Sequence, residues 1–142
     1  MEITPQMLDD NNKNSLYNTI GIRIQQAVDG KARSELKPET AVCWPFPGQP
    51  HGGVLFTLLD STMAWAVLSQ IESGYNCATI DLNLHFTLPA KGDFFSCQAE
   101  VTHHTRRSCF LRGDIYDRNS NLVAMGQGVF RIIQMDFPSK TL

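Results

Sequence analysis

One long stretch of the sequence has a helical pattern and is apolar nearly all round. It runs from about residue 53 to residue 70. Its apolar members are Val54, Leu55, Phe56, Leu58, Leu59, Met63, Ala64, Trp65, Ala66, Val67 and Leu68. A helix without a wide polar face is stable only where other elements cover most of its surface. The sequence therefore predicts one central helix that the rest of the chain buries on most sides.

Apolar residues alternate with polar residues along most of the remaining chain, which predicts strands. We expect strands at about residues 22–25, 31–36, 79–88, 95–102, 108–117 and 122–133. The Asp29-Gly30 pair is typical of a tight hairpin turn between the first two. The four long strands have short connections and so pair antiparallel, because parallel neighbours need long crossovers. The prediction is an α+β domain whose open sheet edges favour pairing with a second copy.

The chain has 142 residues, which is the length of one ordinary domain, and we expect a single domain over 1–142. Thr4-Pro5 is typical of a helix start, so a short helical segment is expected at about 4–20. Three prolines between residues 44 and 50 predict a stiff loop without regular structure, directly before the central helix.

Composition excludes several classes of partner. Lys and Arg number 12 against 14 Asp and Glu, a balance that favours neither nucleic acid nor an anionic membrane. The four cysteines lack C-x-x-C or zinc-type spacing, so we expect no metal and reduced thiols. The first residues do not resemble a signal peptide, and the apolar stretch over 54–68 is too short and too polar to cross a bilayer. A cytoplasmic protein is the expectation.

Asp60 lies near the middle of the apolar helix. An unpaired carboxylate is costly to bury, so this position needs an explanation. One explanation is structural, because the hydroxyls of Thr57, Ser61 and Thr62 lie within one turn. The other is catalytic, because a carboxylate in such surroundings suits a general base or a nucleophile. We favour the catalytic interpretation.

His51-Gly52-Gly53 stands at the start of the same helix. Two glycines at a helix N-terminus expose backbone N–H groups at the positive end of the helix dipole. Such donors suit a developing oxyanion, because nothing has to reorient when charge appears. The alternative is a tight turn that needs glycine only for its backbone conformation. We interpret His51 as a residue that positions this turn.

The spacing of the two features has a geometric consequence. Gly52 and Asp60 are eight positions apart, so on one straight helix they lie about 12 Å from each other. A catalytic carboxylate and an oxyanion donor must both lie about 3 Å from the reacting group. One chain therefore cannot supply both to one substrate. If both are catalytic, Asp60 of one subunit works with Gly52 of another, and the protein is a homodimer.

Two further places could contribute. Thr79 opens the first long strand and could hold a water or the substrate carbonyl, although a β-branched residue at a strand start needs no function. Arg106 and Arg107 lie in a polar connection between two strands. They could bind phosphate groups, and a solvated hairpin tip is an equal alternative.

The string from His51 to Thr62, H-G-G-V-L-F-T-L-L-D-S-T, resembles the hotdog-fold thioesterases of the PaaI-like, phenylacetate-pathway type. Their motif is HGG, six residues, and an acidic residue on the central helix. The strand from Thr79, T-I-D-L-N-L-H-F-T-L-P-A-K-G, and the segment from Asn121, N-L-V-A-M-G-Q-G, are similar to the corresponding strands of that family. The resemblance covers about residues 43 to 133.

The resemblance implies a hotdog fold, with an antiparallel sheet wrapped around one long helix, and an acyl-CoA thioesterase activity. It implies that Asp60 is the general base or nucleophile, that the Gly52 N–H of the neighbouring subunit polarises the carbonyl, and that Thr79 helps to place the water. Coenzyme A would be part of the substrate, with no separate cofactor, and the protein a homodimer or a dimer of dimers. The predicted catalytic set is Asp60, Gly52, His51 and Thr79. The candidate substrate-binding residues are Gly53, Gln49, Ser61, Arg106 and Arg107.

The chain departs from the family at Pro45, where an Asn or Gln is common. Gln49 is a candidate to replace that amide. The loop from Phe46 to Pro50, F-P-G-Q-P, also resembles hotdog dehydratases, but their catalytic histidine would stand where Pro45 is. Two alternatives therefore stay open, a hydratase or dehydratase of acyl thioesters and a non-catalytic acyl-CoA-binding module.

Overall fold

The computed structural model describes residues 1–135. Its elements, in chain order, are α1 (Pro5–Asn11), α2 (Ser15–Ile20), β1 (Ile22–Val28), β2 (Lys31–Leu36), α3 (Thr40–Cys43), α4 (Gly52–Leu68), β3 (Tyr75–Phe86), β4 (Phe95–His104), β5 (Ser108–Asp117) and β6 (Leu122–Gln134).

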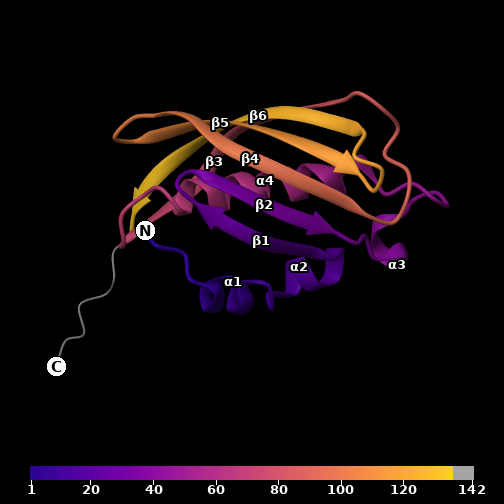
Figure 1. Cartoon of the computed structure of the whole chain (residues 1–142), viewed down its shortest axis with the longest axis horizontal. Coiled ribbons are helices and arrows are strands. Elements are labelled where there is room, and N and C mark those ends of the chain that lie inside the picture. The colour runs from indigo at the N-terminus through magenta and orange to yellow at the C-terminus, as the bar shows by residue number, and fades with distance from the viewer. Residues whose placement is uncertain (136–142) are drawn as a thin grey trace.

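The six strands form one sheet in the order β1-β2-β4-β5-β6-β3, and every neighbouring pair is antiparallel. The sheet curves over α4, and α4 contacts all six strands (Figure 1). The short helices α1 and α2 lie beside β1, at the far edge from β3. The predicted α+β architecture, an antiparallel sheet wrapped around one central helix, is confirmed.

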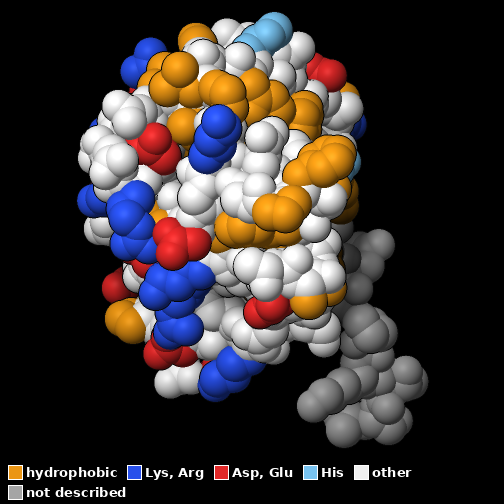
Figure 2. Space-filling model, turned by 90° about the vertical axis from the view of Figure 1, so that its right-hand side faces the viewer, with side chains coloured by type: hydrophobic (Ala, Val, Ile, Leu, Met, Phe, Trp, Pro, Cys, Tyr) orange, Lys and Arg blue, Asp and Glu red, His pale blue; other side chains and the backbone are white. Residues whose placement is uncertain are grey.

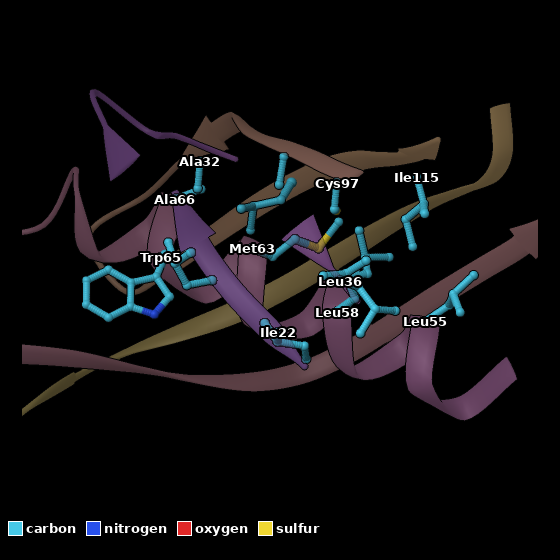
Figure 3. Packing of buried hydrophobic residues seen from close by; sticks show 14 of the residues in the cluster. Ile22, Ala32, Leu36, Leu55, Leu58, Met63, Trp65, Ala66, Cys97 and Ile115 are labelled. Atoms are coloured by element: carbon cyan, nitrogen blue, oxygen red, sulfur yellow. The ribbon is translucent and has the colours of Figure 1, made fainter. Parts of the chain in front are cut away.

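The core lies between α4 and the concave face of the sheet. Leu55, Leu58 and Met63 of α4 are fully buried there. Leu36 of β2 and Cys97 of β4 reach the same layer from the sheet (Figure 3). Burial of each large apolar side chain contributes about 1.5–3 kcal/mol to the free energy of folding. The apolar side chains around α4 therefore hold the sheet curved over the helix. The structure confirms that most sides of α4 are covered.

Glycines in the sheet allow this close approach. A Cβ atom at Gly126 of β6 would lie 2.4 Å from the backbone carbonyl oxygen of Asn83 and 2.7 Å from Leu59 Cδ2. A Cβ atom at Gly113 of β5 would lie 2.6 Å from Leu59 Cδ1. Both glycines face α4. A side chain at either position would displace α4 from the sheet, and one at Gly126 would also displace β3 from its pairing with β6.

β3 differs most from the sequence-based prediction. It begins at Tyr75, four residues before the expected start at residue 79, and ends at Phe86. Its pairing with β6 contains one irregularity between Thr79 and Asp81, where Ile80 is an extra residue. Simple alternation would put Ile80 among the inward-facing apolar residues, yet its side chain is 59% exposed. A β-bulge reverses which residues face the core, and local alternation does not reveal it.

The N-terminal segment also differs in detail. The single helical segment expected at about 4–20 is two helices, separated where Asn14 caps α2 through a hydrogen bond from the Tyr17 N–H. The turn α3 before the proline-rich loop has no counterpart among the predicted elements. In residues 1–135 no helix is long and apolar enough to cross a membrane.

Candidate active site

Asp60 and Thr79 come together at the open edge of the sheet. Asp60 lies on α4 and is half-buried, and Thr79 lies on β3, the last strand of the sheet. The Thr79 hydroxyl donates a hydrogen bond of 2.6 Å to Asp60 Oδ1. A distance this short is typical of a hydroxyl bound to an ionised carboxylate. The bulge at Ile80 makes the contact possible, because it turns the Thr79 side chain toward α4.

The hydroxyls near Asp60 on its own helix have other partners. Thr57 donates to the Gly53 carbonyl oxygen at 3.0 Å, and Thr62 donates to the Leu58 carbonyl oxygen at 2.6 Å. Ser61, on the same helix, is 7% exposed. The side-chain partner of Asp60 is therefore Thr79 of β3, and Thr57 and Thr62 donate to backbone oxygens instead.

His51 is the N-cap of α4. Its Nδ1 atom accepts a hydrogen bond of 2.9 Å from the Gly53 N–H, so the imidazole satisfies one of the unpaired donors at the helix start. A Cβ atom at Gly53 would lie 2.9 Å from the same Nδ1 atom. This contact explains the second glycine of the motif. The geometry gives His51 a positioning role, and it gives Gly53 the same role through the imidazole.

Gly52 lies beside Phe86, the last residue of β3, whereas Asp60 lies beside Thr79, nearer the start of that strand. In residues 1–135 the Gly52 N–H forms no hydrogen bond. Gly52 lines a cavity of about 410 Å³ together with Gln49, Phe86 and Leu88. A Cβ atom at Gly52 would lie 3.3 Å from Phe86 Cζ, so Gly52 is level with the end of β3. Gln49 and Gly52 thus line the same cavity.

The proline-rich loop before α4 is ordered by backbone contacts, as its composition predicts. The His51 N–H donates to the Cys43 carbonyl oxygen, and the Gly92 N–H donates to the Gly48 carbonyl oxygen. Phe46 in this loop is 70% exposed. In Figure 2, hydrophobic side chains gather over the upper and right-hand part of this end of the molecule, and charged side chains lie along its left. The exposed apolar residues there are Val42, Phe46, Phe86 and Leu88.

Arg106 and Arg107 line a second cavity, of about 550 Å³. Arg131 of β6 and His104 of β4 line it as well, and none of the three arginines forms a salt bridge within residues 1–135. Sequence reasoning missed Arg131, whose only signal is a basic residue on the polar face of the last strand. Tyr75, which also lines the cavity, is four residues before Thr79, or about 13 Å along β3.

Cys77 lies on β3, two residues before Thr79, and its side chain also faces α4. Its Sγ atom lies 3.7 Å from the Ala64 carbonyl oxygen. Burial, and to a lesser extent the nearby Cys109 and Asp60, raise the pKa of Cys77 to about 12. It is therefore protonated at neutral pH and is not an activated nucleophile.

The sequence from residue 48 to residue 124, more than half of the chain, matches the family model of the thioesterase superfamily. The chain belongs to the thioesterase superfamily. It is 30% identical over 130 residues to a Halobacterium salinarum protein named as a candidate esterase, with 85% of this chain and 86% of that protein covered.

Two solved structures with the same fold illustrate the superfamily. The Escherichia coli PaaI protein from the phenylacetic acid degradation operon is 24% identical with a TM-score of 0.78, over 89% of this chain and 90% of that one. A Streptococcus pneumoniae thioesterase solved with coenzyme A is 21% identical with a TM-score of 0.76, over 90% of this chain and 98% of that one. The sequence-based predictions of a hotdog thioesterase and of a thioester hydrolase are confirmed.

Proposed function

We propose that this thioesterase hydrolyses acyl-CoA at a site shared between two subunits. Asp60 and Thr79 form one half of the site and the Gly52 N–H of the neighbouring subunit forms the other. The observation that carries the proposal is the hydrogen bond of 2.6 Å from Thr79 to Asp60, formed at an open sheet edge rather than inside the chain. The strand β3 has 12 residues and lies at the edge of the sheet, beside this carboxylate. A second molecule that pairs with β3 can therefore reach Asp60.

The surface around Asp60 supports a partner subunit. Phe56, Asp60, Ala64 and Leu68 recur every four residues on α4 and are all half-buried, although most of the helix is buried. They form one stripe beside β3, because residues four apart lie on one face of a helix. A long edge strand next to an apolar stripe is an aggregation hazard for a lone molecule, and pairing with a second copy removes it.

In the proposed reaction Asp60 acts on the thioester carbonyl carbon in one of two ways. It accepts a proton from a water that attacks the carbon, or it attacks directly and forms an anhydride that water then hydrolyses. In either case the carbonyl oxygen gains negative charge, which the partner's Gly52 N–H at a helix N-terminus stabilises. The carbon–sulfur bond then breaks and the thiol of coenzyme A leaves. Thr79 orients the Asp60 carboxylate through its hydroxyl.

We assign the phosphates of coenzyme A to the cavity that contains Arg106, Arg107 and Arg131. Guanidinium groups bind phosphate oxygens through paired hydrogen bonds. The cavity lies about 13 Å along β3 from Thr79, so a substrate with an extended arm between its phosphates and its thioester can reach both places. Coenzyme A is such a molecule, and its presence in the related Streptococcus pneumoniae structure supports the assignment.

A mixed-subunit experiment tests the shared site. Gly52→Pro removes the backbone N–H, and proline is well tolerated at the first residue of a helix. Asp60→Asn removes the carboxylate from the other half-site. Each variant alone is expected to be inactive. Co-expressed in equal amounts they form mixed dimers in which one of the two sites is intact, so activity should return to about a quarter of the wild-type value.

Gly52→Ala is the matched control, because it keeps the N–H and adds a Cβ atom only against the edge of the Phe86 ring. It should retain most of the activity. If co-expression restores nothing although mixed dimers form, the two half-sites do not act on one substrate and the proposal is wrong.

Product analysis separates hydrolysis from the two other functions that the sequence leaves open. Hydrolysis releases one free thiol per acyl-CoA consumed. A hydratase would change an enoyl-CoA without releasing thiol, and a binding module would bind CoA without turnover. Because Pro45 replaces an amide side chain, Gln49→Ala is an informative variant. We expect it to lower the turnover of acyl-CoA, since Gln49 lies beside Gly52.

A further inference from the structure

The cavity of about 410 Å³ that Gly52 lines lies between the turn before α4 and the chain that follows β3. Its other lining residues are Gln49, Pro50, Phe86, Thr87, Leu88, Pro89 and Ala90. None of these lining residues carries a charge. The Thr87 hydroxyl donates a hydrogen bond of 2.6 Å to the Leu122 carbonyl oxygen, and Gln49 carries the one side-chain amide of the lining. Such a lining suits an uncharged and mostly apolar ligand.

The first wall of this cavity is a tight turn. Pro47 and Gly48 occupy its two central positions, and Gly48 has the positive φ, 80°, that the second central residue of a type II turn requires. Phe46 and Gln49 flank the turn as an antiparallel bridge, and the Gln49 N–H donates to the Phe46 carbonyl oxygen at 3.3 Å. Directly opposite residues of such a bridge point to the same side. The exposed ring of Phe46 therefore lies next to Gln49, at the rim of the cavity.

The second wall is the chain from residue 86 to residue 90. The Thr87 N–H donates to the Val123 carbonyl oxygen at 2.9 Å, which holds this wall against the start of β6. Just beyond the wall, the Gly92 N–H donates to the Gly48 carbonyl oxygen at 3.1 Å and so joins the two walls. These contacts fix the distance between the walls, and the cavity therefore sets an upper limit on the size of its ligand.

The reaction proposed above decides which part of the substrate can lie here, so this inference rests on the proposed function. A thioester carbonyl carbon bears three groups in one plane, namely the oxygen, the sulfur and the acyl chain. The oxygen accepts a hydrogen bond from the Gly52 N–H. The sulfur leads toward the arginine-lined cavity of the other subunit, which supplies Asp60 and Thr79. The acyl chain is the remaining group, and the apolar space next to the oxygen belongs to the subunit that supplies Gly52.

We propose that the acyl group binds in the cavity of the subunit that supplies Gly52, and that the substrates are uncharged, apolar acyl groups of up to about ten carbons. A water molecule in the liquid takes roughly 30 Å³, and a methylene group is of similar size, so about 410 Å³ has room for on the order of ten carbons. Phe46 adds apolar contact at the rim. Each substrate molecule then lies across two subunits, with its phosphates on one and its acyl group on the other.

Acyl-CoAs that differ only in chain length test the class of substrate. The value of kcat/KM should rise on the order of fourfold for each added methylene group until the cavity is full, and should stop rising near decanoyl-CoA. Adipoyl-CoA carries a carboxylate where hexanoyl-CoA has its terminal methyl group. It should be hydrolysed about a hundredfold more slowly, because no cation lines the cavity. Equal rates for these two substrates, or a kcat/KM that is independent of chain length, would overturn the assignment.

Leu88 offers a way to change the size of the cavity without disturbing the core, because it lines the cavity and is 46% exposed. Leu88→Trp fills part of the space and should move the optimum to acyl groups about four carbons shorter, whereas Leu88→Ala should move it to longer ones. Val42→Trp is the matched control, since Val42 is exposed and does not line the cavity. Its chain-length profile should equal that of the wild type. The same shift in Val42→Trp as in Leu88→Trp would refute the location.

The mixed dimer of Gly52→Pro and Asp60→Asn chains shows which subunit holds the acyl group. Its one intact site combines Gly52 of the Asp60→Asn chain with Asp60 of the other chain. Leu88→Trp should therefore shorten the preferred acyl group when it is added to the Asp60→Asn chain, and should leave the preference unchanged when it is added to the Gly52→Pro chain. The opposite result would place the acyl group on the subunit that supplies Asp60 and overturn the proposal.

Thiol release separates failure of this assignment from failure of the proposed function. If no acyl-CoA of any length releases thiol, the proposed function is wrong and the acyl site falls with it. Inactive mixed dimers would refute both the shared site and the division of the substrate between subunits. If the mixed dimers are active but Leu88→Trp changes the chain-length profile in neither chain, the shared site stands and the acyl group lies elsewhere.

Discussion

Replacing Thr79 with valine removes one hydroxyl and leaves the branching of the side chain unchanged. The lost interaction is the hydrogen bond of 2.6 Å to Asp60 Oδ1. Hydrogen bonds to charged groups contribute about 1.5–3 kcal/mol. With about 1.36 kcal/mol for each factor of ten in rate, the turnover number should fall about 10- to 150-fold. The tenfold decrease is expected if solvent reaches the Thr79–Asp60 hydrogen bond, and the 150-fold decrease if the partner subunit covers it.

The assay follows the free thiol of coenzyme A with a thiol-trapping dye under saturating acyl-CoA. Thr79→Ser keeps the hydroxyl and should retain most of the turnover, which separates the hydrogen bond from the shape of the residue. KM should change little in Thr79→Val, because the hydroxyl contacts the carboxylate and not the acyl group. The free energy of unfolding in urea should also fall, by about 0.5–1.5 kcal/mol, because the same hydrogen bond contributes to the stability of the folded chain.

Combining Thr79→Val with Asp60→Asn tests whether the hydroxyl works through the carboxylate. If it does, the double variant is no slower than Asp60→Asn alone, because residues that act as a unit are not additive. The reasoning is refuted if Thr79→Val turns over within twofold of the wild type, or if Thr79→Ser loses as much as Thr79→Val.

Three further predictions concern packing, titration and substrate binding. Gly126→Ala should lower the free energy of unfolding by about 1–3 kcal/mol in urea titrations, and by more than Gly113→Ala, because its Cβ would meet a backbone oxygen of β3 at 2.4 Å rather than chiefly flexible side chains. Burial raises the pKa of the Cys97 thiol to about 12, whereas an unfolded chain ionises near 9. Stability should therefore fall as the pH rises above about 9, since only the unfolded state releases the proton. Cys97→Ala should make that fall shallower by up to about 1.4 kcal/mol per pH unit, and an unchanged slope would contradict the assignment. Replacing both Arg106 and Arg107 with alanine should raise KM for acyl-CoA on the order of tenfold, but leave KM for an acyl-pantetheine thioester, which lacks the nucleotide phosphates, unchanged. Equal effects on both substrates would place the phosphates elsewhere.

The central helix, its start and its buried surroundings are readable from the sequence alone. An apolar pattern with a period near 3.6 is a local property, and so is the position of a glycine pair at a helix start. The spacing between Gly52 and Asp60 follows from helix geometry, which is why a site shared by two subunits can be inferred without coordinates. The β2 and β5 boundaries agree with the prediction for the same reason, since regular alternation and turn residues define them.

The tertiary structure decides how the site is assembled. Regular alternation would turn Thr79 away from the side that Leu82 faces, and only the bulge at Ile80, created by pairing with β6, turns it toward Asp60. Arg131 joins Arg106 and Arg107 because β6 ends beside the connection between β4 and β5, a contact between distant segments. A bulge and a neighbouring strand depend on partners that lie far away in the sequence, so no local pattern contains them.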